Sequence, residues 1–271
     1  MKDVNILSQY EGWGLNKPCK LSDTLRLFVG DQWMVFVGPP FEAGRHKHHA
    51  AQWSFSADGA ITAEMDNGQL ITAEGVFIPP DCSHSMQMAS RVLMIYWEPE
   101  HSLCRAYLAR HGAFYRLPMA QNLVLDDVLT AKQAESLALR CIRSDLNKKN
   151  HDSTKAVDYR VVAVQDWVRA NIAQTLALEF AAKTVHISPA HLSRLFRTQC
   201  GTTFRAFVRW ARLRQALDFA FHGATLTEAA HRSGFADSAH LSRTFRAMFG
   251  VAPDFLFGYR DRLHVEIVRE L

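Results

Sequence analysis

AHLSRLFR at residues 190–197 returns as AHLSRTFR at residues 239–246, identical at seven of eight positions and shifted by 49 residues. Apolar side chains recur at helical spacing on one face of each copy, namely Leu192, Leu195 and Phe196, then Leu241, Phe245 and Phe249. The opposite face carries small residues and two arginines. The repeat therefore predicts two short helices, each with an apolar back and an arginine-bearing front.

The residues that flank each copy are typical of helix ends. Ser188 followed by Pro189 predicts an N-cap and a first helical residue, and Gly201 predicts the end of that helix. In the second copy Asp237 or Ser238 is the expected N-cap. A further short helical pattern precedes each copy, at residues 176–185 and 226–234. Two helices joined by a tight turn form a helix-turn-helix unit, whose second helix enters the major groove of DNA.

Residues 203–223, between the copies, keep helical spacing. A helix of about 20 residues spans ~30 Å, and successive major grooves on one face of B-DNA lie ~34 Å apart. We therefore expect one long helix to hold the two reading helices over adjacent grooves. Its arginines are candidates for phosphate contacts, namely Arg205, Arg209, Arg212 and Arg214.

Charge is distributed unevenly along the chain. The formal net charge is +4, but residues 155–271 hold 16 Lys and Arg against 10 Asp and Glu, a net of +6, whereas residues 1–154 hold 15 against 17, a net of −2. A basic second half favours a polyanionic partner such as DNA.

The segment from about residue 159 to residue 257 resembles the DNA-binding domain of the AraC/XylS family of bacterial transcription regulators. The stretches that carry the resemblance are SPAHLSRLFRTQCGTTF, RAFVRWARLRQAL and LTEAAHRSGFADSAHLSRTFRAMFGVAP. The resemblance implies a sequence-specific DNA-binding regulator and not an enzyme. An activator is in keeping with the family, but the sequence leaves activation and repression both open. It further implies a cytoplasmic homodimer that binds double-stranded DNA and has RNA polymerase as a further partner.

The resemblance also implies which side chains contact bases. They are Ala190, Ser193 and Arg194 in the first reading helix, and Ser238, Ala239 and Arg243 in the second. Arg197 and Arg246, on the same helix faces, and Arg209, on the long helix, complete the expected DNA-binding residues.

The first hundred residues have the pattern of a β-domain. Strand-like runs occupy residues 33–37, 52–56, 75–80 and 91–97, and two more flank Asn67-Gly68, a sequence typical of a type I′ hairpin turn. Short strands at this spacing predict a sandwich or a small barrel, and the resemblance implies a cupin-like one. The predicted fold class is α+β in two domains. A cupin-like β-barrel or sandwich and some helices come first, followed by an all-α domain with two helix-turn-helix units joined by a long helix.

We expect four segments along the chain. Residues 1–100 form the cupin-like sensor domain, and residues 101–146 a helical segment. Residues 147–155, NKKNHDSTK, are polar and are interpreted as a linker, and residues 156–271, helical in pattern throughout, as the DNA-binding domain. The helical pattern at residues 126–146 has two interpretations, a dimerising helix, as the resemblance implies, or a cap on the β-domain.

His46, His48, Trp53 and His84 are the candidate ligand-binding residues of the β-domain. His46 and His48 lie two residues apart on an expected strand and so share a face. In metal-binding cupins, which this half resembles, such a pair joins a later histidine and a carboxylate, but AQW stands at residues 51–53 where a glutamate would be. Three histidines can hold zinc or iron, or can hydrogen-bond around a pocket.

We favour a small organic effector over a metal and assign no cofactor. The aromatic residues that are candidates to line its pocket are Trp33, Phe36, Trp53, Phe55, Phe77 and Trp97. The other histidines of this half, His49, His101 and His111, have no partner pattern and are expected on the surface.

Two alternatives to a ligand-modulated regulator stay open. One is a cupin metalloenzyme fused to a DNA-targeting domain, and the other is a regulator whose β-domain docks a protein partner. We expect neither a signal peptide nor a membrane span, because the sequence has no apolar run of the required length. The five cysteines form no CxxC pair, which favours a reducing compartment.

Overall fold

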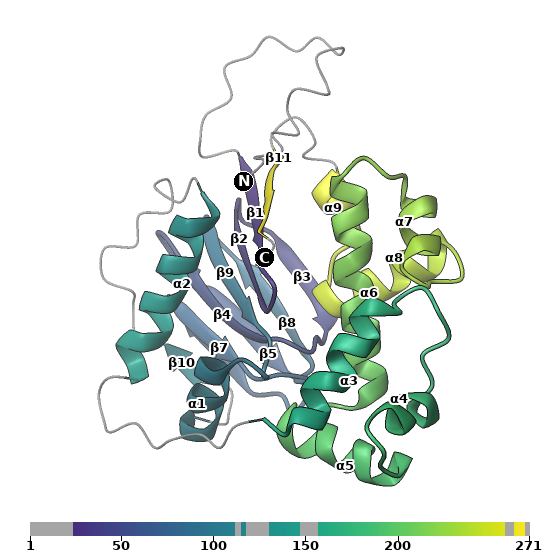
Figure 1. Cartoon of the computed structure of the whole chain (residues 1–271). Helices are drawn as coiled ribbons and strands as arrows, with labels where there is room; N and C mark the ends of the chain where they lie inside the picture. Colours follow the sequence, from purple (N-terminus) through teal and green to yellow (C-terminus); the bar gives the residue numbers. More distant parts are fainter. Residues whose placement is uncertain (1–23, 112–114, 118–129, 147–156, 258–262, 269–271) are drawn as a thin grey trace.

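The computed structural model describes residues 24–111, 115–117, 130–146, 157–257 and 263–268. The strands are β1 (Leu25–Val29), β2 (Trp33–Gly38), β3 (Glu42–His46), β4 (Ala51–Ser56), β5 (Ile61–Met65), β6 (Leu70–Ala73), β7 (Gly75–Ile78), β8 (His84–Met88), β9 (Val92–Trp97), β10 (Tyr115–Leu117) and β11 (Leu263–Ile267). The helices are α1 (Ser102–His111), α2 (Ala131–Leu146), α3 (Tyr159–Ala170), α4 (Leu178–Thr184), α5 (Pro189–Gln199), α6 (Phe204–Phe221), α7 (Leu226–Arg232), α8 (Ser238–Phe249) and α9 (Asp254–Phe257). Strands form one half of the molecule, and helices α3 to α9 form the other (Figure 1). In the described part of the chain, every helix is too short or too polar to cross a lipid bilayer.

Two sheets face each other in the strand-rich half. The larger has the order β10-β7-β4-β9-β2-β1-β11, and the smaller has the order β3-β8-β5-β6. Side chains from both sheets, among them Ile61, Met86 and Met94, pack into one buried cluster between them. The predicted α+β class is confirmed, and of its two predicted forms the sandwich is the one observed, because the sheets do not close into a barrel.

The predicted hairpin around Gly68 is confirmed, with β5 and β6 paired antiparallel. Its turn is not the expected type I′, because Gly68 has a φ of 79° while Asn67 is not among the described residues with positive φ. Met65 N donates to Gln69 O across a three-residue loop. A loop of this length needs one left-handed residue, which glycine supplies without strain.

Helices α1 and α2 cover the outer face of the larger sheet (Figure 1). Leu137 and Ile142 of α2 are buried against that face. The apolar side of α2 is thus used within the chain, which agrees with the capping interpretation, and the homodimer stays a prediction. The expected linker at residues 147–155 and the first residues of the helical pattern at 126–146 lie outside the described residues.

The helical half follows its local sequence signals. Ser188 caps α5 by accepting a hydrogen bond from His191 N, with proline in the first turn. Asp237, rather than Ser238, is the N-cap of α8. Helix α6 has 18 residues, so it spans ~27 Å, close to the length expected for the connecting helix.

The end of the chain departs from the predicted all-helical pattern. Residues Leu263–Ile267 form β11, which pairs in parallel with β1 at the edge of the larger sheet. The backbone N–H of Ala131, at the start of α2, donates to Glu266 Oε2 at 2.7 Å. The alternation of Leu263, Val265 and Ile267 is a pattern typical of a strand. A single short run of this kind does not indicate which distant strand it pairs with.

Candidate nucleic-acid interface and its contact with the sandwich

Helix α5 presents its predicted DNA-facing residues to solvent. Ala190, Arg194 and Arg197 are exposed and Ser193 is partly exposed. The opposite face is buried, as expected, and contacts α3 and α6 through one apolar cluster. Neither arginine forms an ion pair with any other described residue, so each guanidinium is available to a base edge or a phosphate.

Helix α8 repeats this arrangement. Ala239, Arg243 and Arg246 are exposed and Ser238 is partly exposed, while Leu241 and Phe245 are buried. Gly250 ends the helix with a φ of 72° in the left-handed region. The two reading helices therefore share caps, buried backs and exposed arginines, as the repeat predicted.

The arginines of α6 divide into two groups. Arg205 and Arg209 are exposed, as a phosphate contact requires. Arg212 instead donates to the backbone oxygens of Ile172 and Gln174. Arg214 donates to groups of the sandwich, described next. Arg212 and Arg214 are therefore structural residues, contrary to the prediction that they contact phosphate.

Glu98 is the polar centre of the contact between the two halves. It follows β9 in the sandwich, is 3% exposed, and accepts from Trp210 Nε1 at 2.8 Å and from Arg214. Arg214 also donates to the backbone oxygens of Gly30 and Asp31. Burial alone would raise the pKa of Glu98, but the positive charges of Arg214 and Arg169 lower it below its ordinary value. Glu98 therefore stays ionised and fastens α6 to the sandwich.

A second contact joins the end of α8 to β3. Gly44 N donates to Gly250 O at 2.9 Å, and Lys47 N donates to Ala247 O at 3.0 Å. A Cβ placed on Gly250 would lie 2.4 Å from Gly44 O and 2.7 Å from His46 Nδ1. The second reading helix is thus bonded through its backbone to the segment that carries the candidate histidines.

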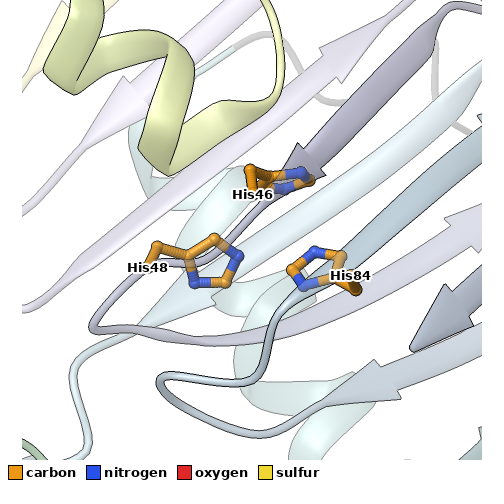
Figure 2. A group of neighbouring side chains, drawn as sticks. All are labelled: His46, His48 and His84. Atoms are coloured by element: carbon orange, nitrogen blue, oxygen red, sulfur yellow. The ribbon is translucent and has the colours of Figure 1, made fainter. Parts of the chain in front are cut away.

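The structure brings His46, His48 and His84 together (Figure 2). His46 ends β3, His84 begins β8, and His48 lies in the connection after β3, not on the strand as predicted. All three are buried, and one ligand nitrogen from each lies within 4.8 Å of the others. Burial lowers the pKa of His46 to about 3, with His48 adding to the effect. Burial likewise lowers the pKa of His48 and of His84, so all three rings are neutral near pH 7.

Trp53 does not join these histidines. It is fully buried on the outer face of the larger sheet, where its ring contacts Phe77 and Tyr107 of α1. Alternation along β4 explains the separation, because Gln52, one residue earlier, is on the opposite face beside His48. Among the expected pocket aromatics, Phe55 and Phe77 belong to this outer cluster as well.

His49 was expected on the surface, and this is wrong. It is 2% exposed, and its Nε2 lies 2.9 Å from Glu100 Oε1. Burial opposes protonation, but Glu100 raises the pKa of His49 above its ordinary value. Sequence reasoning also missed Glu98 and Glu100, although two acids directly after the apolar run VLMIYW were a signal for buried, paired carboxylates.

A cleft of about 710 Å³ opens beside Glu98, between the two halves of the chain. Trp33 and Trp97 line it from the sandwich, and Arg169, Phe207 and Arg214 line it from the helices. Acidic side chains line it too, among them Glu98 and Asp166, which pair with these arginines. The cleft therefore combines aromatic surface with charged groups of both signs, and a molecule inside it would touch both halves at once.

Comparison with known proteins agrees with this geometry. The sequence pattern of the helix-turn-helix domain family matches residues 181–257. The uncharacterized transcriptional regulator YpdC of Escherichia coli is 33% identical over 139 residues, covering 51% of this chain and 46% of YpdC. The activator RhaR of Pectobacterium atrosepticum is 28% identical over 152 residues, covering 55% of this chain and 52% of RhaR. Residues 181–257 thus match the helix-turn-helix domain family, and about half of the chain is similar to transcription regulators.

The chain spans about half the length of those two curated relatives. Among solved structures, unsaturated fatty acid-bound ToxT of Vibrio cholerae covers most of the fold, with a TM-score of 0.57, 16% identity, and coverage of 83% of this chain and 95% of ToxT. At that identity the likeness concerns the fold, a strand-rich domain followed by a helical one.

Proposed function

We propose that this protein is a sequence-specific DNA-binding transcription regulator of the AraC/XylS type that acts in the cytoplasm. The observation that carries the proposal is the pair of reading helices, α5 and α8, with matched caps and buried backs and with exposed arginines at the same positions. Helix α6, of 18 residues, connects the two units and spans ~27 Å, a length of the same order as the ~34 Å between adjacent major grooves.

The test is a genome-wide map of the protein on its host DNA, with the Arg194→Ala/Arg243→Ala double variant as control. Discrete sites that the control loses would support sequence reading. A map without discrete sites, obtained with a folded protein under several growth conditions, would contradict the proposal. In that case the docking and metalloenzyme alternatives would take its place.

The effector site of the proposed regulator is the cleft beside Glu98. A small organic molecule there would contact Trp97 and Phe207 with its apolar part and the charged side chains around Arg169 with a polar part. Because these residues belong to both halves, its binding would change how α6 sits on the sandwich. The three histidines are buried, whereas the cleft, of about 710 Å³, offers room for an organic ligand.

Screening of a metabolite panel by thermal melting checks this assignment. A true effector raises the melting temperature of the wild type and has a much smaller effect on Arg169→Ala, whose side chain lines the cleft. Arg209→Ala, on the exposed side of α6, is the matched control and should respond as the wild type does. A panel with no active compound would favour a protein partner for the sandwich instead.

Two further partners follow from the family and are part of the proposal. RNA polymerase is the expected contact of an activator bound next to a promoter. A homodimer would place two copies on one operator, and sedimentation of the protein with operator DNA would measure the stoichiometry.

A further inference from the structure

The three-histidine cluster has the chemistry of a metal-binding site. Each Nδ1 lies close to a backbone oxygen two residues away in sequence. The distances are 2.7 Å from His46 to Gly44 O, 2.7 Å from His48 to Ala50 O and 2.9 Å from His84 to Cys82 O. A neutral imidazole that donates from Nδ1 has its lone pair on Nε2. Backbone carbonyls thus fix this tautomer in His46 and His84, the arrangement that holds metal-binding histidines in place. His48 has an oxygen acceptor at each ring nitrogen, Ala50 O and Gln52 Oε1, and a neutral ring donates to only one of them.

The Nε2 atom of His84 is available as a metal ligand. His84 Nε2 is buried and has no hydrogen-bond partner in the described part of the chain. The ligand nitrogens lie within 4.8 Å of one another, whereas nitrogens on one tetrahedral ion, bound at ~2.0–2.1 Å, lie ~3.4 Å apart. Small rotations of rings that already face one space (Figure 2) would close this difference.

Gln52 supplies a polar atom where the sequence lacks the expected carboxylate. Its side chain is fully buried, and its Oε1 lies 2.8 Å from His48 Nε2. An amide oxygen can complete a site made of three imidazoles without adding negative charge. The donor set is then three nitrogens and one oxygen, which suits divalent ions late in the first transition series and not magnesium or calcium.

We propose that His46, His48 and His84, with Gln52 beside them, bind one divalent transition-metal ion of the zinc and cobalt type, and that its occupancy fixes the end of α8 against β3. The second part depends on the two backbone hydrogen bonds from Gly44 and Lys47 to the end of α8. His46 lies between these two donors in sequence, so an ion that holds its ring also holds both of them. The coupling to DNA rests on the proposed regulatory function, whereas metal binding itself does not.

Titration of the full chain with Co²⁺, after removal of metal with a chelator, tests the site directly. We expect visible absorption bands of imidazole-bound Co²⁺ that saturate at one equivalent and disappear when Zn²⁺, the stronger competitor, is added. Mg²⁺ should leave the bands unchanged. If no bands appear up to millimolar Co²⁺, the proposal is wrong.

Variants locate the ion. His48→Ala and His84→Ala should each weaken Co²⁺ binding by at least ~100-fold, because even partners that only orient a ligand contribute 10–100-fold. His231→Ala, an exposed histidine on α7, is the matched control and should bind as the wild type does. Unchanged binding in both cluster variants would place the ion elsewhere and overturn the assignment.

Gln52→Glu keeps the test decisive if the alanine variants fold poorly. A buried carboxylate should destabilise the metal-free protein, yet it adds a charged ligand and should tighten Co²⁺ binding by at least ~10-fold. Thermal melting with and without Zn²⁺ would show both effects, a lower melting temperature without metal and a larger rise with it. A rise no larger than that of the wild type would contradict a role for Gln52.

Hydrogen exchange at the amides of Gly44 and Lys47 measures the coupling. Metal should slow exchange at both positions in the wild type and have no effect in His48→Ala. The Arg194→Ala/Arg243→Ala variant should bind Co²⁺ normally, so loss of DNA reading and loss of metal binding are separate results. Full metal occupancy without slower exchange would overturn the coupling.

Discussion

At the scale of single residues, Arg194 and Arg243 are the main candidates for reading sequence. Both are exposed at corresponding positions of α5 and α8. We expect Arg194→Ala or Arg243→Ala to cost about 1–3 kcal/mol of binding free energy and to relax specificity at one base position. Selection of bound sequences from a random pool would measure both effects.

Arg209→Ala is the comparison for these two variants. Its exposed side chain on α6 is a phosphate candidate, so we expect weaker binding to all sequences alike and a salt slope lower by ~1. If it changed specificity in the same way as Arg194→Ala, the division between base and phosphate contacts would be incorrect.

Glu98 gives a prediction about stability and pH. The pKa of Glu98 in the folded protein is below its ordinary value of 4.5. The ionised carboxylate therefore stabilises the fold fully at a pH above 4.5. This contribution is lost as the pH falls through the lowered pKa. We expect Glu98→Gln to lower the free energy of unfolding by about 3 kcal/mol at pH 7, because Arg214 loses its buried partner. The difference from the wild type should shrink in acid.

Urea denaturation at several pH values measures this difference. Glu64→Gln is a suitable control, since Glu64 pairs with Arg45 at the surface, where its side chain is 50% exposed. Surface ion pairs contribute about 0–1 kcal/mol. A Glu98 variant as stable as this control at pH 7 would show that Glu98 does not hold α6 on the sandwich.

At the scale of elements, the N-cap of α8 is open to a clean test. Asp237 accepts a hydrogen bond from His240 N at 2.6 Å. Asp237→Ala should therefore destabilise the protein by about 1 kcal/mol, whereas Asp237→Asn, another good N-cap, should cost little. Chemical denaturation of both variants checks the order, and equal losses would argue against a capping role.

The elements that the sequence predicted well are those with local signals. Ser188, Asp237 and Gly250 mark helix ends within a few residues, and helical periodicity identifies the buried faces of α5 and α8. The turn at Gly68 was placed correctly but typed incorrectly, because loop length, not the Asn-Gly pair alone, selects the turn. Strand β11 was missed because only its contact with β1 makes it a strand.

The candidate sites show the same limit. Matched spacing predicted that the histidine pair would meet His84, and it does. Glu98, His49 and Trp210 acquire their roles only where the two halves meet, at sequence separations that no local pattern reports. Trp53 lies on the face of β4 opposite to the histidines, because successive side chains along a strand point to opposite faces and Gln52 is the one beside His48.

At the scale of the whole molecule, β11 should contribute to the stability of the sandwich. A chain that ends at residue 262 loses the parallel pairing of Leu263–Ile267 with β1. We expect its free energy of unfolding to fall by roughly 3 kcal/mol, since each backbone hydrogen bond contributes about 1 kcal/mol. A chain that ends at residue 268 is the control, because it keeps the strand. Similar melting of the two chains would show that the pairing contributes little.

Because β10 and β11 belong to the same sheet, the DNA-binding helices amount to an insertion between two of its strands. The chain connects them to the sandwich at two points, before α3 and after α9, and not through a single linker. A protease cut within residues 147–156 should therefore nick the chain without separating its pieces, which would still elute together. Two covalent connections therefore restrict any movement of the reading helices relative to the sandwich. Its range is smaller than that of a domain joined through one linker.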